Sequence, residues 1–372
     1  MTKTLFPSSY EGSRQRFCDD LPLVQMHWPQ ARLSSHPLAG ETGLSIDWIE
    51  SPALRSNEKV VIFTTGEHGI EGYVGSSMLQ GFIEEYLVQL NPENTGIFLL
   101  HAINPWGMKH RRRTNRNNVD LNRNFGWNPE TYNPSVNPPY DRILRLLNPE
   151  HPLRSTTGLA GSSGLLARYL SMRKAGFQKA TLLGQYRHPK GIYYGGIALQ
   201  EETRLLQEHY RRLFSQYGQI LHLDMHTGYG PRFQMSLVNS FKEPRDSKNL
   251  ETTFNYPLVV KTNPEEFYAI QGDMIDYVYT LAEQEFPDRR LYATSFEFGT
   301  YGDSLKASLR GLRSMVWENQ VFWNGAYSVR IVERVSHDFM ELFFPQADDW
   351  QQKALLDARQ AFDGILTAEG YI

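Results

Sequence analysis

The sequence predicts an α/β fold in which a mixed, largely parallel central sheet is flanked by helices. Two unbroken apolar runs, residues 60–63 and 97–100, are typical of strands buried on both faces. Residues 78–90, between them, carry apolar side chains at helical spacing. This strand–helix–strand order favours a parallel, right-handed unit. An amphipathic helix at 201–217 and an alternating strand at 221–226 continue the same pattern farther along the chain.

The other expected elements surround this pattern. They are helices at 10–17, 142–147, 161–175, 272–285 and 336–366, and strands at 43–48 and 291–298. Residues 1–56 are predicted to be an N-terminal extension packed on the core. Residues 57–372 are predicted to form the main domain, with a helical C-terminal tail. The long polar loop at 104–137 and the glycine-bounded loop at 184–196 are expected to serve function, because loops on a rigid sheet often do.

Composition narrows the class of protein. The chain has 372 residues, of which 40% are hydrophobic and 21% charged, so it can bury a sizeable core. Its net charge of -3 favours neither nucleic acid nor an anionic membrane as a partner. A single cysteine, Cys18, excludes an internal disulfide framework. The first residues lack the apolar core of a signal peptide, and no apolar run is long enough to span a membrane. We therefore expect a cytoplasmic protein.

A glycine-rich turn follows the strand at 60–63 and carries an imidazole and a carboxylate, His68 and Glu71. Open parallel sheets place their ligands at the carboxyl ends of the strands. Two histidines and a glutamate with an open fourth position form a known catalytic zinc set. The third expected ligand is His226, which ends a buried strand. Taken alone, the first pair also fits an ordinary surface turn, and His226 also fits a core histidine.

Two more polar side chains share a face of this strand with His226. Asp224 is expected to orient a ligand, because metal-bound imidazoles commonly donate their other N–H to a carboxylate. An ordinary turn residue is the alternative for Asp224. His222 lies deeper in the strand and is interpreted as a core histidine.

The loop at 111–125 contains five arginines interleaved with asparagines. A run of charge is usually a solvated face. The planar fork of arginine, however, suits bidentate binding of a carboxylate. The position of the run after a predicted strand end favours the second interpretation.

Several motifs stand in the order found in carboxypeptidase A-like zinc metallopeptidases, and the chain resembles a bacterial branch of that family. They are His68-x-x-Glu71, Asn104-Pro105-x-Gly107, Asn118-Val119-Asp120-Leu121-Asn122-Arg123-Asn124-Phe125, His226 and Glu297. Of these motifs, the string around Asp120 is the one most specific to that family. The resemblance covers roughly residues 57–305.

The resemblance implies a role for each matching residue. One zinc ion would be held by His68, Glu71 and His226, with Asp120 supporting the first histidine. Asn122 and Arg123 would bind the terminal carboxylate of a substrate, and Tyr268 would be a mobile cap over it. Arg113 would stabilise the transition state, with Arg112 and then Arg116 as the alternatives.

Glu297 is the implied general base. It alternates with Phe296 and Phe298 on a predicted strand, so we expect partial desolvation that raises its pKa. A solvated carboxylate on an edge strand is the alternative. Such a base can take a proton from zinc-activated water and pass it to the leaving amine.

These residues predict a zinc metallocarboxypeptidase or related amide hydrolase, acting on a peptide or small amide with a free carboxylate. One alternative keeps the metal and removes acyl groups from amino acids, as in aminoacylase-like relatives such as aspartoacylase and succinylglutamate desuccinylase. A second alternative is a binding module without turnover. The sequence names neither the substrate nor the oligomeric state.

Overall fold

The computed structural model describes residues 6–130, 132–155, 164, 167, 170–172, 176–177, 180–181, 183–262 and 272–372. Its centre is an eight-stranded sheet with the order β1-β2-β4-β3-β5-β8-β6-β7. The strands are β1 (Arg32–Pro37), β2 (Ser45–Ser51), β3 (Lys59–Thr65), β4 (Thr95–His101), β5 (Gln219–Thr227), β6 (Met235–Asn239), β7 (Val259–Lys261) and β8 (Arg290–Phe298).

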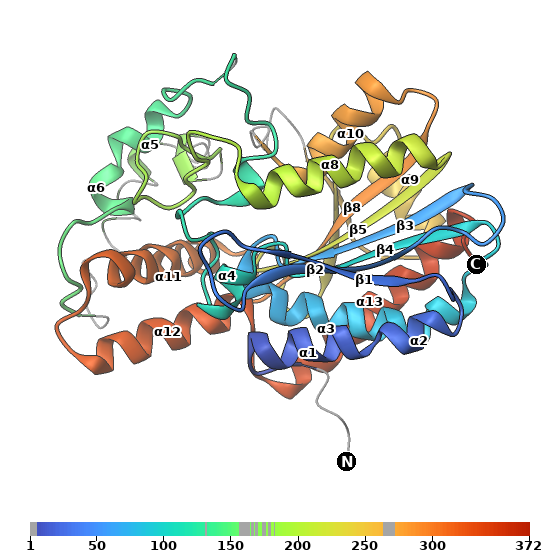
Figure 1. The fold of residues 1–372 in the computed structure, drawn as a ribbon. Coiled ribbons are helices and arrows are strands. Elements are labelled where there is room, and N and C mark those ends of the chain that lie inside the picture. The colour runs from blue at the N-terminus through green and yellow to red at the C-terminus, as the bar shows by residue number, and fades with distance from the viewer. Residues whose placement is uncertain are drawn as a thin grey trace.

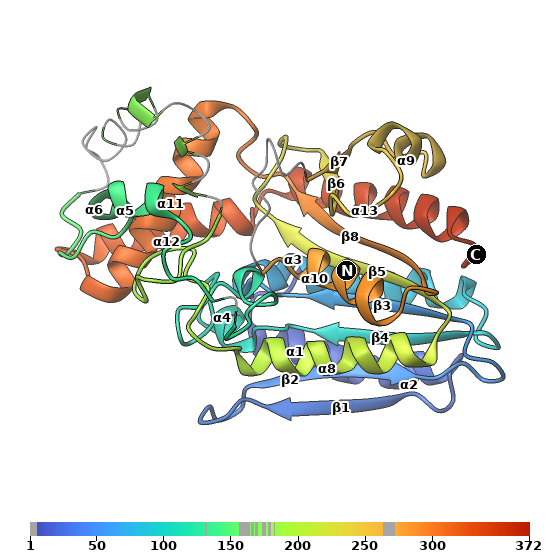
Figure 2. The ribbon, with the colours of Figure 1, turned by 90° about the horizontal axis from the view of Figure 1, so that it is seen from above.

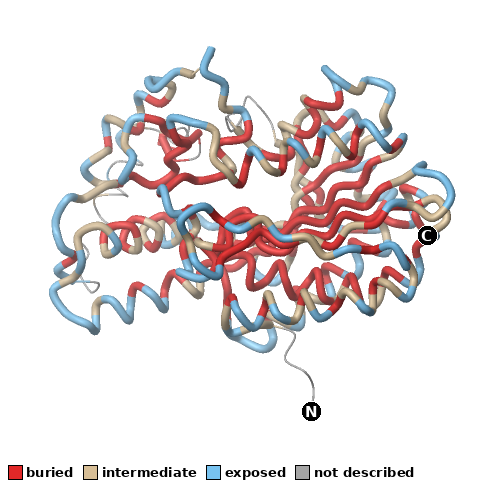
Figure 3. Tube along the Cα trace, in the orientation of Figure 1, coloured by how far each residue is buried: buried red, intermediate tan, exposed pale blue. Residues whose placement is uncertain are grey.

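The predicted fold class is confirmed. The four central strands, β4, β3, β5 and β8, are mutually parallel. Antiparallel pairing joins β2 to β4 on one side and β6 to β8 on the other, so the whole sheet is mixed. The tube in Figure 3 is buried along these central strands, because helices cover both faces.

Helices lie on both sides of the sheet (Figure 1). In that view α8 (Glu201–Gln216) and α10 (Met274–Glu285) lie above it, and α1 (Tyr10–Asp19), α2 (Leu21–Gln25), α3 (Gly72–Glu85) and α13 (Asp348–Ala368) lie below it. In α8 the buried stripe includes Leu206, Tyr210 and Leu213, as the spacing predicts.

A second group of helices lies beyond the carboxyl ends of the parallel strands (Figure 2). The group contains α4 (Pro105–Lys109), α5 (Pro138–Arg142), α6 (Leu144–Leu147), α11 (Leu305–Asn324) and α12 (Val329–Phe343). A separate hydrophobic cluster, with Tyr140, Leu147 and Trp317 among its members, joins α5, α6 and α11. This small core holds the group over the strand ends.

Some elements differ from the sequence prediction. The tail is two helices, α12 and α13, rather than one. The prediction missed β1, β6, β7, α11 and the short α9 (Ser247–Thr253). The strand β1 is an edge strand with no fully buried residue, so its sequence lacks the apolar run that marks the central strands. Most of the helix expected at 161–175 lies outside the described residues.

The first 56 residues supply β1 and β2, which form one edge of the same sheet. The division into 1–56 and 57–372 stays a prediction. Among the helices that the structure describes, none combines the length and apolarity needed to cross a membrane.

Candidate metal centre

The turn after β3 has the special backbone that its glycines predict. Gly66 has a φ of 65°, in the left-handed region that glycine adopts without strain. A Cβ on Gly69 would lie 2.1 Å from the carbonyl carbon of Gly107 in α4, so only glycine fits there. A short 3-10 helix, Gly69–Glu71, then leads into α3. This tight path turns His68 and Glu71 back toward the strand ends.

The structure brings together His68, Glu71 and His226, the three residues expected as metal ligands. The Nδ1 atom of His68 lies 3.0 Å from Oε1 of Glu71, and Nδ1 of His226 lies 3.2 Å from Oε2 of the same carboxylate. The backbone N–H of Thr227 also donates to Oε2 at 2.9 Å. All three side chains are buried. Burial alone would raise the pKa of Glu71, but His68, His226 and Arg113 together lower it far below its usual value.

Both imidazoles are held from their other nitrogen by an aspartate. Nε2 of His68 lies 3.1 Å from Asp120 Oδ1, and Nε2 of His226 lies 2.5 Å from Asp224 Oδ2. A carboxylate only accepts hydrogen bonds, so each Nε2 carries the proton in these contacts. Each Nδ1 faces Glu71 on the other side of the ring, which is where a metal ion would bind to imidazoles that outer carboxylates hold in this way.

Glu67 is a further member of this group, and the sequence analysis missed it. Its carboxylate is fully buried, and Oε2 lies 3.5 Å from Nε2 of His226. Neither oxygen has a hydrogen-bond partner among the described residues. Burial raises the pKa of Glu67 well above its usual value; the His226 charge opposes this rise and Asp224 adds to it. The only signal in the sequence is an acidic residue directly before His68.

We call these residues the histidine cluster: Glu67, His68, Glu71, Asp120, Asp224 and His226. Donor atoms of Glu67, His68 and His226 lie within 4.8 Å of one another. Glu67 approaches His226 on the edge that Asp224 already holds, whereas Glu71 faces Nδ1. Two imidazoles and a carboxylate are the donor set of catalytic zinc sites, so the residues present fit a zinc ion.

Glu297 lies beside the cluster on the neighbouring strand. It is paired in register with His226, because β5 and β8 run parallel. Its side chain is only partly exposed, and its Oε2 has no hydrogen-bond partner among the described residues. Burial raises the pKa of Glu297 to about 7; the charge on His226 opposes the shift and the charge on Glu71 reinforces it.

Of the three arginines considered for the transition state, Arg113 touches the cluster. Its NH1 lies 3.1 Å from Glu71 Oε1, and its Nε lies 3.2 Å from Asp120 Oδ2. Arg116 instead lies on the surface, where it binds the carbonyl of Ala39 and lies 4.0 Å from Glu41.

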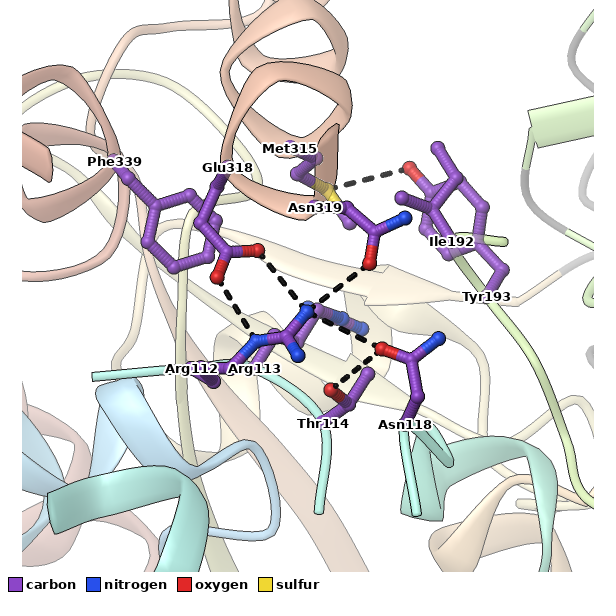
Figure 4. Close-up of a pocket in the computed structure, with 10 residues that line it drawn as sticks. All are labelled: Arg112, Arg113, Thr114, Asn118, Ile192, Tyr193, Met315, Glu318, Asn319 and Phe339. Atoms are coloured by element: carbon purple, nitrogen blue, oxygen red, sulfur yellow. Dashed lines mark hydrogen bonds and ion pairs between the residues drawn. The ribbon is translucent and has the colours of Figure 1, made fainter. Parts of the chain in front are cut away.

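Arg112 binds Glu318 and Asn319 of α11 (Figure 4). Its Nε donates to Glu318 Oε1 at 2.9 Å, and NH2 donates to Asn319 at 3.0 Å and Asn118 at 3.2 Å. Its guanidinium lies 3.6 Å from the ring centre of Phe322. We call Arg112, Asn118, Glu318 and Asn319 the arginine clamp. The clamp ties the loop before Asp120 to α11.

The residues expected to bind a carboxylate lie in a short 3-10 helix, Leu121–Arg123. Arg123 is buried, with its guanidinium 6.0 Å from the ring centre of Tyr193. Asn122 accepts a hydrogen bond from the backbone N–H of Met274 at 2.9 Å, and its side chain also hydrogen-bonds to Asp273, the N-cap residue of α10. Tyr268, the expected cap, lies outside the described residues.

The loop at 184–196 braces this segment. The backbone N–H of Asp120 donates to the carbonyl of Tyr194 at 2.8 Å, and the Tyr186 hydroxyl donates to the carbonyl of Arg123 at 2.7 Å. Tyr193 has a φ of 58°, which is unusual for a residue with a side chain. A small pocket lies beside Arg113, and Figure 4 shows the side chains around it. They are Arg112, Arg113, Thr114, Asn118, Ile192, Tyr193, Met315, Glu318, Asn319 and Phe339.

Comparison with known proteins identifies a family. A family model described as "Protein of unknown function (DUF2817)" matches residues 6–357. None of the curated proteins has a matching sequence.

Several solved structures are similar in fold. Carboxypeptidase A from Helicoverpa armigera is 14% identical, with a TM-score of 0.47, over 97% of this chain and 77% of that chain. Bovine thrombin-activatable fibrinolysis inhibitor is 13% identical, with a TM-score of 0.45, over 90% of this chain and 97% of that chain. Murein-tripeptide amidase MpaA from Escherichia coli O157 is 18% identical, with a TM-score of 0.37, over 78% of this chain and 91% of that chain.

Proposed function

The chain belongs to the DUF2817 family, and from that premise we propose that it is a zinc-dependent hydrolase that cleaves an amide next to a free carboxylate. One observation carries the proposal. The Nδ1 atoms of His68 and His226 face the same carboxylate, Glu71, while an aspartate holds each Nε2. A buried pair of imidazoles oriented in this way suits a metal ion and has no evident structural purpose.

His68, Glu71 and His226 would hold one zinc ion. The ion would supply a Lewis acid that polarises a carbonyl and lowers the pKa of water to about 7. Asp120 and Asp224 keep the two imidazoles in the tautomer that leaves Nδ1 free. Thr227 and Arg113 fix the orientation of Glu71 through its two oxygens.

Glu297 is the general base in this proposal. Its pKa of about 7 keeps it a base near neutrality and lets it give up the proton afterwards. It takes a proton from the attacking water and delivers that proton to the leaving nitrogen. The position of Glu297, one strand away from His226 and in register with it, supports this role.

Two arginines complete the site. Arg113 borders both the cluster and the pocket, so its guanidinium can stabilise negative charge as it develops on the carbonyl oxygen. Arg123 is proposed to bind the free carboxylate of the substrate, with the amide of Asn122 beside it. Tyr268 is retained as a proposed cap.

The test is hydrolysis by zinc-loaded protein of three matched substrates: an N-acyl dipeptide with a free carboxylate, its C-terminal amide, and an N-acyl amino acid. We expect cleavage of the first, with kcat/KM at least about 100-fold lower for the C-terminal amide, because Arg123 then loses its charged partner. Exclusive cleavage of the N-acyl amino acid would replace this proposal with a deacylase. Absence of hydrolysis of all three by protein that retains zinc would contradict it.

A further inference from the structure

We propose that Thr64 and His222 are positioning residues, which fix the orientation of His226 through Asp224. The inference rests on the proposed function, in that His226 is taken as a metal ligand. It gives a role to His222, which the sequence analysis interpreted as a core histidine.

The four residues form a continuous chain across two neighbouring strands. Thr64 on β3 is paired in register with Asp224 on β5, and side chains of paired residues in parallel strands point to the same face. The Thr64 hydroxyl lies 2.6 Å from Asp224 Oδ1 and 2.9 Å from His222 Nε2. The other oxygen of Asp224 lies 2.5 Å from His226 Nε2. All four side chains are at most 3% exposed.

The direction of every hydrogen bond in this chain is determined. A carboxylate cannot donate, so the Thr64 hydroxyl donates its single proton to Asp224. The Thr64 oxygen must then accept from His222, whose proton therefore lies on Nε2. Asp224 accepts from Nε2 of His226 with its second oxygen. Nδ1 of His226 faces Oε2 of Glu71, 3.2 Å away, which is the side on which a metal ion would bind.

The surroundings of His222 agree with this polarity. Its Nδ1 has no hydrogen-bond partner among the described residues, as expected for the unprotonated nitrogen. The Tyr210 hydroxyl, 3.5 Å from Nε2, is engaged with the sulfur of Met274 at 3.1 Å. Burial lowers the pKa of His222 to about 4, so the ring is neutral at pH 7. A neutral ring with its proton on Nε2 donates to the Thr64 oxygen at 2.9 Å, which is closer than the Tyr210 oxygen.

This chain matters because Asp224 must hold one orientation to set the tautomer of His226. With one oxygen bound by Thr64, the carboxylate cannot rotate away from the imidazole. Valine at position 64 would have nearly the shape of threonine but would remove the only proton that Oδ1 receives here. The substitution would therefore weaken zinc binding by His226 without changing the packing around position 64.

The first experiment compares the zinc dissociation constants of purified variants by competition with a chelator. We expect Thr64→Val to weaken zinc binding about tenfold, within the range seen when outer partners of metal ligands are removed. Thr64→Ser keeps the hydroxyl and should stay within about threefold of the parent. The matched control is Thr294→Val, which removes an equally buried strand hydroxyl that donates to the carbonyl of Val238. Equal zinc affinity in the Thr64→Val and Thr294→Val proteins would overturn the inference.

The second experiment needs no metal. Long-range proton–nitrogen NMR spectra of metal-free protein report which ring nitrogen of each histidine carries a proton, and His222→Gln assigns the signal of His222. We expect the Nε2–H form in the parent and in Thr64→Ser, and a displaced Nε2 signal in Thr64→Val. An Nδ1–H form of His222 would refute the inference even if zinc binds. Failure of the proposed function would instead be seen as absence of zinc binding or hydrolysis in the parent protein.

Discussion

Arg112 and Arg113 are neighbours in the chain, but their side chains join two different buried polar groups. Arg112 enters the arginine clamp, where one carboxylate, Glu318, faces one guanidinium. Arg113 enters the histidine cluster, where it contacts both Glu71 and Asp120. The two groups lie on opposite sides of the same loop and differ in how completely their charges are matched.

In the clamp the charges balance. Arg112 is paired with Glu318, and the side-chain oxygens of Asn118 and Asn319 accept from its NH2, whereas its NH1 has no hydrogen-bond partner among the described residues. In the cluster, four carboxylates share one arginine and two imidazoles, and the described residues offer Glu67 no hydrogen-bond partner. Buried charges that lack partners are costly. The difference indicates that the charges of the clamp are matched within the protein, whereas the excess of carboxylates in the cluster suits it to receive a cation.

The largest expected effect concerns the base beside the cluster. Glu297→Gln should lower kcat by about 10²–10⁴-fold, because a positioned general base contributes that much. Zinc content should not change, since Glu297 is not among the proposed ligands. The measurement is kcat on the best substrate together with metal analysis of the same sample. Unchanged kcat would remove Glu297 from the mechanism.

The two arginines offer a direct contrast. Arg112→Gln should lower the free energy of unfolding by about 3 kcal/mol, because it leaves Glu318 without its partner. Activity per folded molecule should remain. Arg113→Gln should instead lower kcat/KM by about 10²–10³-fold. Denaturant unfolding and steady-state kinetics on both proteins check this, and similar losses of kcat/KM in the two variants would erase the distinction between clamp and cluster.

The pH profile follows from the pKa of Glu297, about 7. The base acts only when ionised, so protonation removes activity as the pH falls. We expect kcat/KM to decrease about tenfold for each pH unit below the pKa. The slope should be measured between pH 5 and 8 on zinc-loaded protein. A midpoint near the ordinary value for glutamate would show that burial does not tune this group.

The smallest effect concerns Glu67, whose pKa is raised in the folded chain. A raised pKa means that the folded protein binds more protons than the unfolded chain at neutral pH, so the charged carboxylate destabilises the fold as the pH rises. Glu67→Gln should therefore raise the stability of metal-free protein at pH 8 by about 1 kcal/mol, with little gain at pH 4. The comparison variant is Glu318→Gln, which should destabilise. Zinc should reduce the gain from Glu67→Gln.

Local patterns were enough to predict much of the centre of this molecule. The apolar runs that became β3 and β4 and the glycine turn depend on residues close together in the chain, whereas the order of His68, Asp120, His226 and Glu297 was interpreted through the resemblance to a known family. A strand buried on both faces needs continuous apolar residues, and a turn at its end needs glycine. These requirements are visible in any short window of sequence.

Other features depend on distant packing. The position of Arg112 depends on α11, whose Glu318 binds Arg112 from about 200 residues away. The edge strands β1, β6 and β7 depend on pairing with strands already in the sheet rather than on an apolar run of their own. The isolation of Glu67, and the hydrogen bonds that join Thr64 to His222, arise only when β3 and β5 lie side by side. The sequence alone was sufficient to predict that His68, Glu71 and His226 meet at the strand ends, because parallel strands end at the same edge of a sheet, but it did not predict that Glu67 joins them. Only the tertiary structure decided which of their charges are matched, because that depends on what packs against them.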